Sequence, residues 1–229
     1  MLLPAVSFTL AWLCFAPAAE GLSSVRIEET PHVVDSGGFS AEACTAMALT
    51  RLGRSATVDD VFHTARIDPA LGRGAKPEEL AAALPALGFE RAEGIYRLAE
   101  DSTAQRAEHF ASLHHDLRAG VPTMIALRAD SGAARCVLVF GYQAERDLVE
   151  LHDPIGPEGR GRLLPRSELL NRWATADAEG RLRLVRLPLV PARDPVVFPS
   201  PDRPKPAEFA RHVRRLRARL PEAIHQLTA

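Results

Sequence analysis

Apolar positions follow a helical spacing in much of the first half of the chain. From Cys44 to Gly53, small and apolar residues are almost continuous, which is typical of a helix buried on most sides and ended by glycine. Ser40 lies just before this run and suits the N-cap position. The pattern predicts one helix that starts near residue 40 and ends at 53. It predicts further helices over residues 57–65, 76–87 and 103–118.

The second half contains shorter apolar runs rich in valine, isoleucine and leucine. Such runs are typical of strands. Residues 181–187 alternate arginine with apolar side chains, as in a strand with one solvent-exposed face. We expect strands over residues 89–96, 122–127, 136–142, 148–152 and 181–187. Helices followed by strands indicate an α+β fold.

Both ends of the chain differ from this body, which we place at residues 23–190. Seven prolines between residues 188 and 206 exclude a helix there, and we interpret residues 191–206 as a semi-rigid linker. Residues 207–227 form an amphipathic pattern with arginines on the polar side, which predicts a C-terminal helix. A solvated basic face on a docked helix is the simplest interpretation.

The first 19 residues predict export. They carry no charged residue, and an apolar run is followed by the small residues Ala16-Pro17-Ala18, which a signal peptidase accepts. Cleavage would leave a secreted or periplasmic protein without a stable membrane span. An uncleaved anchor and a buried N-terminal helix are the alternatives, because no lysine or arginine precedes the apolar run.

The overall charge excludes one class of partner. The net charge is −1, so no whole-chain electrostatic case exists for binding nucleic acid. Nothing predicts a metal or cofactor, since the spacing of His114 and His115 fits no familiar zinc motif. Cleavage would leave Cys44 and Cys136, which form either one disulfide or two separate thiols.

Two features would suit thiol catalysis. Cys44 lies at the start of the buried helix, where a helix N-terminus favours a thiolate. Asp153-Pro154 ends a predicted strand, where an aspartate could orient a base. Each also has an ordinary interpretation, Cys44 as a packed small residue and Asp-Pro as a turn.

Five short motifs in order resemble those of cysteine peptidase family thirty-nine, which includes the double-glycine leader peptidases of bacteriocin export. They span residues 33–187 and are Cys44-Thr45-Ala46-Met47, the stretch 72–89, Leu117-Arg118-Ala119-Gly120-Val121-Pro122, the strand ending Gly141-Tyr142, and Asp153-Pro154. The resemblance implies a bacterial hydrolase ancestry and a papain-like fold, with a helical half packed on an antiparallel sheet. It also implies that Cys44 is the nucleophile and that Asp153 is the orienting acid.

The chain departs from that family at two positions. Arg135 occupies the place of the catalytic histidine, and a guanidinium stays protonated, so it cannot act as a general base. Gly38 and Phe39 stand where the family has an oxyanion glutamine. We therefore expect a catalytically impaired pseudoenzyme with a site of Cys44, Arg135 and Asp153 that binds a peptide or protein in the old cleft.

Two alternatives remain open at this point. One is an active cysteine peptidase or amidase that uses another histidine as its base, chosen from His32, His63, His109, His114, His115 and His152. The other is an adaptor that acts through the basic C-terminal helix. The sequence does not reveal the oligomeric state.

Overall fold

The structure is a computed structural model, and it describes residues 21–35, 38–98, 102–129, 132–176, 180–193, 210–215 and 217–218. The predicted signal segment 1–19 lies outside these residues, as does most of the predicted linker. No helix in the described part of the chain is long and apolar enough to span a membrane.

An antiparallel sheet forms the centre of the molecule. Its strand order is β2-β8-β3-β4-β5-β6, with β1 paired to β4 and β7 paired to β8. Every pairing is antiparallel. The strands are β1 (Val25–Arg26), β2 (Ile95–Arg97), β3 (Thr123–Arg128), β4 (Ala134–Gln143), β5 (Leu148–His152), β6 (Arg162–Pro165), β7 (Ala174–Ala176) and β8 (Leu182–Pro188).

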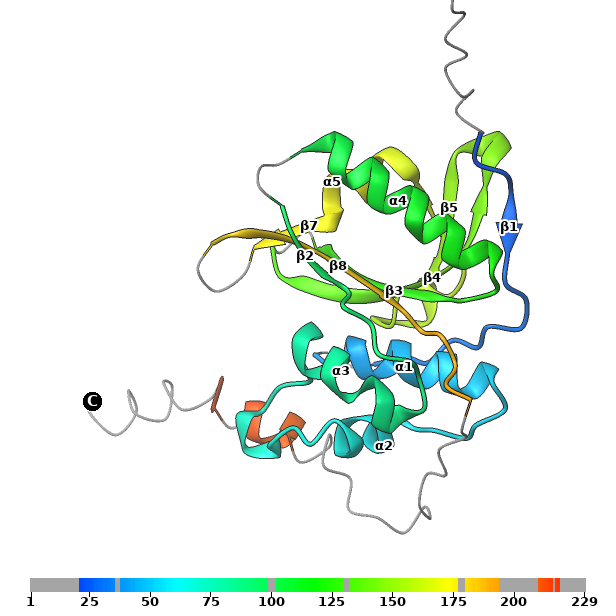
Figure 1. The fold of residues 1–229 in the computed structure, drawn as a ribbon. Helices are drawn as coiled ribbons and strands as arrows, with labels where there is room; N and C mark the ends of the chain where they lie inside the picture. Colours follow the sequence, from blue (N-terminus) through cyan, green and yellow to red (C-terminus); the bar gives the residue numbers. More distant parts are fainter. Residues whose placement is uncertain are drawn as a thin grey trace, which may run out of the picture.

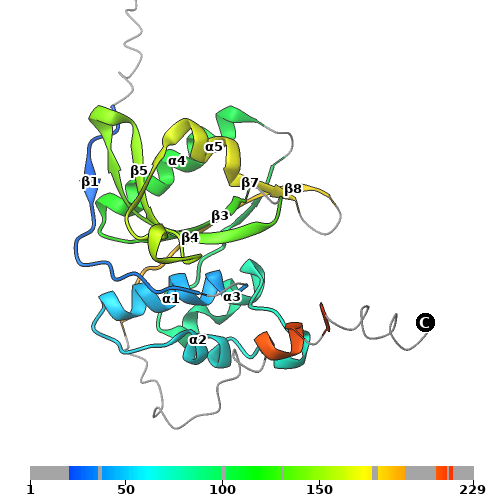
Figure 2. The ribbon, with the colours of Figure 1, turned by 180° about the vertical axis from the view of Figure 1, so that it is seen from behind.

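Helices cover both faces of this sheet (Figure 1). One layer contains α1 (Ser40–Arg51), α2 (Val58–Thr64) and α3 (Pro77–Ala83), while α4 (Thr103–Arg118) and α5 (Arg166–Trp173) lie on the opposite face. Figure 2 shows the same two layers from behind. Short 3-10 helices connect the elements at Pro69–Leu71, Leu84–Leu87, Ala144–Arg146 and Pro157–Gly159.

The alternation of side chains along β3 and β4 divides the core in two. Met124, Ala126, Cys136 and Leu138 pack with α1 and α3, and the residues between them pack toward α4 and α5. Successive side chains of a strand point to opposite faces, so a continuous apolar run can serve both cores. The predicted α+β fold, with helices packed on an antiparallel sheet, is confirmed.

Most predicted elements form close to their expected bounds. The helix expected at 103–118 is α4, and the strand expected at 148–152 is β5. The helix expected at 57–65 is α2, whose N-terminus has a capping box between Thr57 and Asp60. Ser40 is the first residue of α1, and its N-cap is Phe39.

Two predicted elements are shorter than expected. The helix expected at 76–87 changes to a 3-10 helix at Leu84, because Pro85 lacks an N–H and its ring crowds the preceding turn. Of the strand expected at 89–96, only the end joins β2, since Gly94 has a φ of 60° and interrupts the extended backbone. The sequence interpretation assigned nothing to residues 162–176, which form β6, α5 and β7.

Candidate functional site

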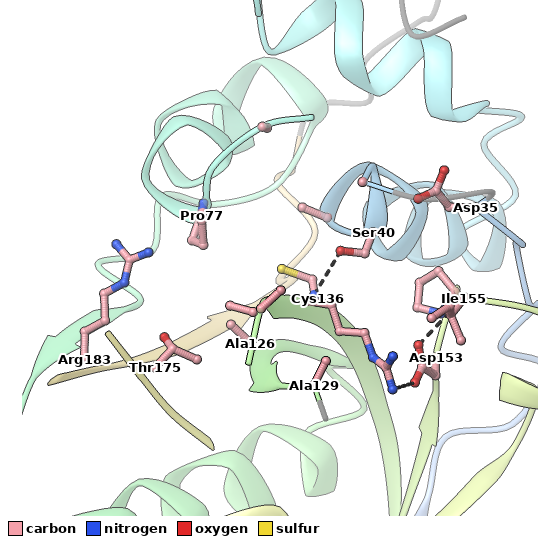
Figure 3. A pocket seen from close by; sticks show the side chains of 17 residues that line it. Asp35, Ser40, Pro77, Ala126, Ala129, Cys136, Asp153, Ile155, Thr175 and Arg183 are labelled. Carbon is pink, nitrogen blue, oxygen red and sulfur yellow. Dashed lines mark hydrogen bonds and ion pairs between the residues drawn. The ribbon is translucent and has the colours of Figure 1, made fainter. Parts of the chain in front are cut away.

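A cavity of about 340 Å³ lies between the helical layer of α1 and α3 and the sheet. Its walls come from the start of α1, the segment before α3, and the strands β3, β4, β7 and β8. Figure 3 shows Asp35, Ser40 and Asp153 at one end and Thr175 and Arg183 at the other. Alanines at 126, 129, 133 and 134 leave room between these polar ends.

Ser40 joins the start of α1 to the start of β4. Its Oγ accepts a hydrogen bond from the backbone N–H of Cys136, 3.0 Å away. The pairing of β4 with β5 ends at Leu138 and His152, so this N–H receives its acceptor from the helix side chain instead of from β5. The strand that leads into Gly141-Tyr142 therefore lies against the beginning of α1, as the family resemblance implies.

Arg135 and Asp153 form an ion pair at the same end of the cavity. Arg135 Nη2 lies 2.6 Å from Asp153 Oδ2, and Arg162 Nη1 lies 3.5 Å from the same oxygen. The Asp153 side chain is 2% exposed and that of Arg135 is 23% exposed. The position expected to hold a base thus carries a guanidinium that is held by a buried carboxylate.

Cys44 lies outside this arrangement. It is the fifth residue of α1, fully buried in the core with Met47 and Leu84, and it is not among the residues that line the cavity. Burial raises the pKa of its thiol well above the ordinary value, and the nearby Cys136, Asp153, Glu42 and Asp35 raise that pKa further. The structure therefore brings Arg135 and Asp153 together but leaves Cys44 about one helical turn away from the cavity wall.

Cys136, unlike Cys44, lines the cavity. Arg135 and Cys136 point to opposite faces of β4 near the start of the strand, and both line the cavity. Burial raises the pKa of the Cys136 thiol to about 12. Both cysteines are free, and no disulfide joins them.

No histidine lines the cavity in the described part of the chain. His32 is close to Asp153, but its Nε2 contacts the backbone carbonyl oxygen of that residue, at 2.9 Å, rather than the carboxylate. His152 makes hydrogen bonds with the backbone of Thr30 and Gly161, and burial lowers the pKa of its imidazole. Nor do any three histidine, cysteine or acidic side chains of the described residues form a group that would hold a metal.

The sequence interpretation missed three polar residues of the cavity: Asp35, Thr175 and Arg183. The Asp35 carboxylate accepts a hydrogen bond from the backbone N–H of Phe39. It also forms an ion pair with Arg211, whose Nη2 lies 3.3 Å from Asp35 Oδ1. The sequence signal near Asp35 is the turn-favouring run Asp35-Ser36-Gly37-Gly38, which says nothing about a site. Thr175 and Arg183 gave no signal, because their place depends on the pairing of β7 with β8.

The C-terminal segment contributes to the same region. Residues 210–215 and 217–218 are helical, and Ala210 is buried against Phe39, Phe62 and Ile67. The Arg211 guanidinium lies 4.5 Å from the centre of the Phe39 ring. The described part of the predicted C-terminal helix therefore packs against the start of α1.

Neither a protein-family model nor a curated protein sequence matches the chain. Several solved structures are similar, and three of them are described below. The peptidase domain of Streptococcus ComA, a bi-functional ABC transporter involved in quorum sensing, is 14% identical over 73% of this chain and 98% of that chain, with a TM-score of 0.44.

The second is a double-glycine-motif protease from an AMS/PCAT transporter, solved with its leader peptide. It is 14% identical over 72% of this chain and 97% of that chain, with a TM-score of 0.45. The third is xylellain, a cysteine protease from Xylella fastidiosa, 11% identical over 74% of this chain and 86% of that chain, with a TM-score of 0.47. The likeness concerns the overall course of the chain, and no residue role follows from it.

Proposed function

We propose that this chain is an exported papain-like cysteine peptidase homologue that has lost thiol catalysis and binds a peptide or protein segment in its cavity. The observation that carries the proposal is the ion pair between Arg135 and Asp153. Both residues line the cavity together with Ser40, in the first turn of α1, and no imidazole, which thiol catalysis would need, lines it within the described residues. A guanidinium paired in this way can hold an anionic or polar ligand but cannot accept a proton.

The state of the thiols also supports the loss of catalysis. A nucleophilic cysteine needs a lowered pKa and access to substrate. Burial raises the pKa of both Cys44 and Cys136, and Cys44 does not reach the cavity. Binding requires neither condition, since an open cavity with polar groups at both ends and small apolar residues between them suits an extended peptide.

Selection of hexapeptides from a displayed random library against the full chain tests the binding part of the proposal. Ala134 is exposed at the rim of the cavity, so Ala134→Trp should fill the cavity without disturbing the core. We expect this change to weaken the affinity for the selected peptide by a factor on the order of ten or more, as measured by fluorescence anisotropy. Ala119→Trp, at an exposed position after α4, is the matched control and should bind like the wild type.

Mass spectrometry of the same peptide tests the loss of catalysis. The peptide should remain intact with the wild type and also with Arg135→His, because Cys44 does not reach the cavity and the Cys136 side chain points to the opposite face of β4 from residue 135. Cleavage by the wild type that disappears in Cys44→Ala would instead establish the active hydrolase. Equal affinity of the two tryptophan variants would show that the peptide binds elsewhere.

A further inference from the structure

Within the described part of the chain, two buried polar atoms at the β7–β8 end of the cavity have no hydrogen-bond partner. They are Thr175 Oγ1 and Arg183 Nε, and both residues line the cavity wall. Thr175 is only 5% exposed. Figure 3 places both side chains at the end of the cavity near Pro77, away from Asp153. Buried polar groups in proteins are nearly always hydrogen-bonded, so two such atoms in one wall require an explanation.

The two residues are direct neighbours in the sheet. Thr175 of β7 is the register partner of Arg183 of β8, so both side chains stand on the same face with Cβ atoms about 5 Å apart. The Arg183 Nη1 atom is already engaged with the carboxylate of Glu78, which holds the guanidinium in place. The Nε–H and the threonine hydroxyl are therefore two donors that can converge on one acceptor.

Among the residues that the structure describes, the surrounding wall supplies no acceptor side chain for this purpose. Pro77 lacks a polar side chain, and Ala126 and Ala129 form the adjoining surface of the cavity. The charge of Arg183 is balanced by Glu78, so a neutral oxygen suits the position better than a second carboxylate. A backbone carbonyl oxygen of a bound peptide has this chemistry.

We propose that Thr175 and Arg183 form a subsite that binds a backbone carbonyl oxygen of a peptide lying extended along the cavity. This inference rests on the proposed function, since it needs a peptide in the cavity. It adds the path of the bound peptide, which extends between the Arg135–Asp153 end and the β7–β8 end of the cavity and passes Ala126. The subsite recognises main chain and thus tolerates many side chains at that position.

The test uses the selected hexapeptide, acetylated at its N-terminus and made both with a free C-terminal acid and as the amide. Thr175→Val keeps the shape of the side chain and removes the hydroxyl. Arg183→Lys keeps a positive charge for Glu78 and puts a methylene group where Nε stands. Arg118→Lys, at an exposed position on α4, is the control for the arginine exchange.

We expect Thr175→Val and Arg183→Lys each to weaken the affinity for the peptide about three- to tenfold, as the loss of one hydrogen bond does. Thr175→Val should also keep or raise the melting temperature of the free protein, because it removes an unpaired buried hydroxyl. Acid and amide peptides should bind equally well, and the control should bind like the wild type.

Three results would overturn the subsite. The first is unchanged affinity in both variants while Ala134→Trp still abolishes binding, which would leave the proposed function intact. The second is a lower melting temperature of Thr175→Val, which would mean that the hydroxyl has a partner in the free protein. The third is tenfold weaker binding of the amide, which would assign a carboxylate. If no peptide is selected at all, the proposed function itself fails, and the subsite fails with it.

Discussion

The first and second turns of α1 have different surroundings although they belong to one helix. Ser40, in the first turn, lines the cavity and accepts the N–H of Cys136. Cys44, in the second turn, is enclosed by apolar side chains. A helix N-terminus stabilises a thiolate only within its first turn and only where the anion keeps some access to water. One turn of helix is thus enough to separate a position that faces the cavity from a position that only packs.

The largest expected difference between these turns concerns thiol reactivity. Cys44 should react with iodoacetamide at pH 8 on the order of a thousandfold more slowly in the folded protein than in urea, because alkylation requires local opening of the core. Mass spectrometry of alkylated peptides over time measures the rate. Fast labelling of Cys44 with an apparent pKa below the ordinary thiol value would contradict its buried placement. It would support the alternative hypothesis of an active cysteine hydrolase.

Glu42, in the first turn, should make stability depend on pH. Its side chain is buried, and burial raises its pKa from 4.5 to about 7, while the N–H of Ala75, 2.5 Å away, opposes this shift. The folded state therefore keeps a proton that the unfolded state releases. Stability should be highest below pH 4.5, should fall as the pH rises toward 7, and should then level off.

The expected loss across this window is roughly 3 kcal/mol in the free energy of unfolding. Urea unfolding of the wild type and of Glu42→Gln measures it, since glutamine keeps an acceptor for Ala75 but does not titrate. The variant should lack this slope, and the control Glu108→Gln, at an exposed position on α4, should retain it. A wild-type slope that persists in Glu42→Gln would assign the effect to other groups.

Alanine at each of the two positions gives the smallest effect and the most direct comparison. Ser40→Ala should lower the free energy of unfolding by about 1–2 kcal/mol, because it leaves the Cys136 N–H without its acceptor. Cys44→Ala should cost about 1 kcal/mol through lost packing. Only Ser40→Ala should alter the affinity of the selected peptide. An altered affinity in Cys44→Ala alone would reverse the comparison.

Local patterns predicted the elements well, because helix starts, glycine ends and apolar periods are local properties. The capping box at Thr57 and the strand β5 are examples. The pairing of Arg135 with Asp153 could also be expected from motif order. The family motif pointed to Cys44, however, and the spacing alone could not show that the cavity meets α1 one turn earlier.

The remaining parts of the site depend on contacts between distant segments. Thr175 and Arg183 meet only because β7 folds back on β8 after α5, an element that the sequence interpretation did not assign. Asp35 acquires its cation from Arg211, 176 positions further along the chain. No local pattern carries such information.

The contact between Arg211 and Asp35 has a practical consequence for anyone who produces this protein. A shortened version that ends before residue 210 would lack the cation beside Asp35 and the side chain of Ala210 against Phe39. Phe39 immediately precedes Ser40, which lines the cavity, so trimming the far terminus removes contacts beside the cavity wall. Purification tags and truncations at that end therefore belong among the experimental variables.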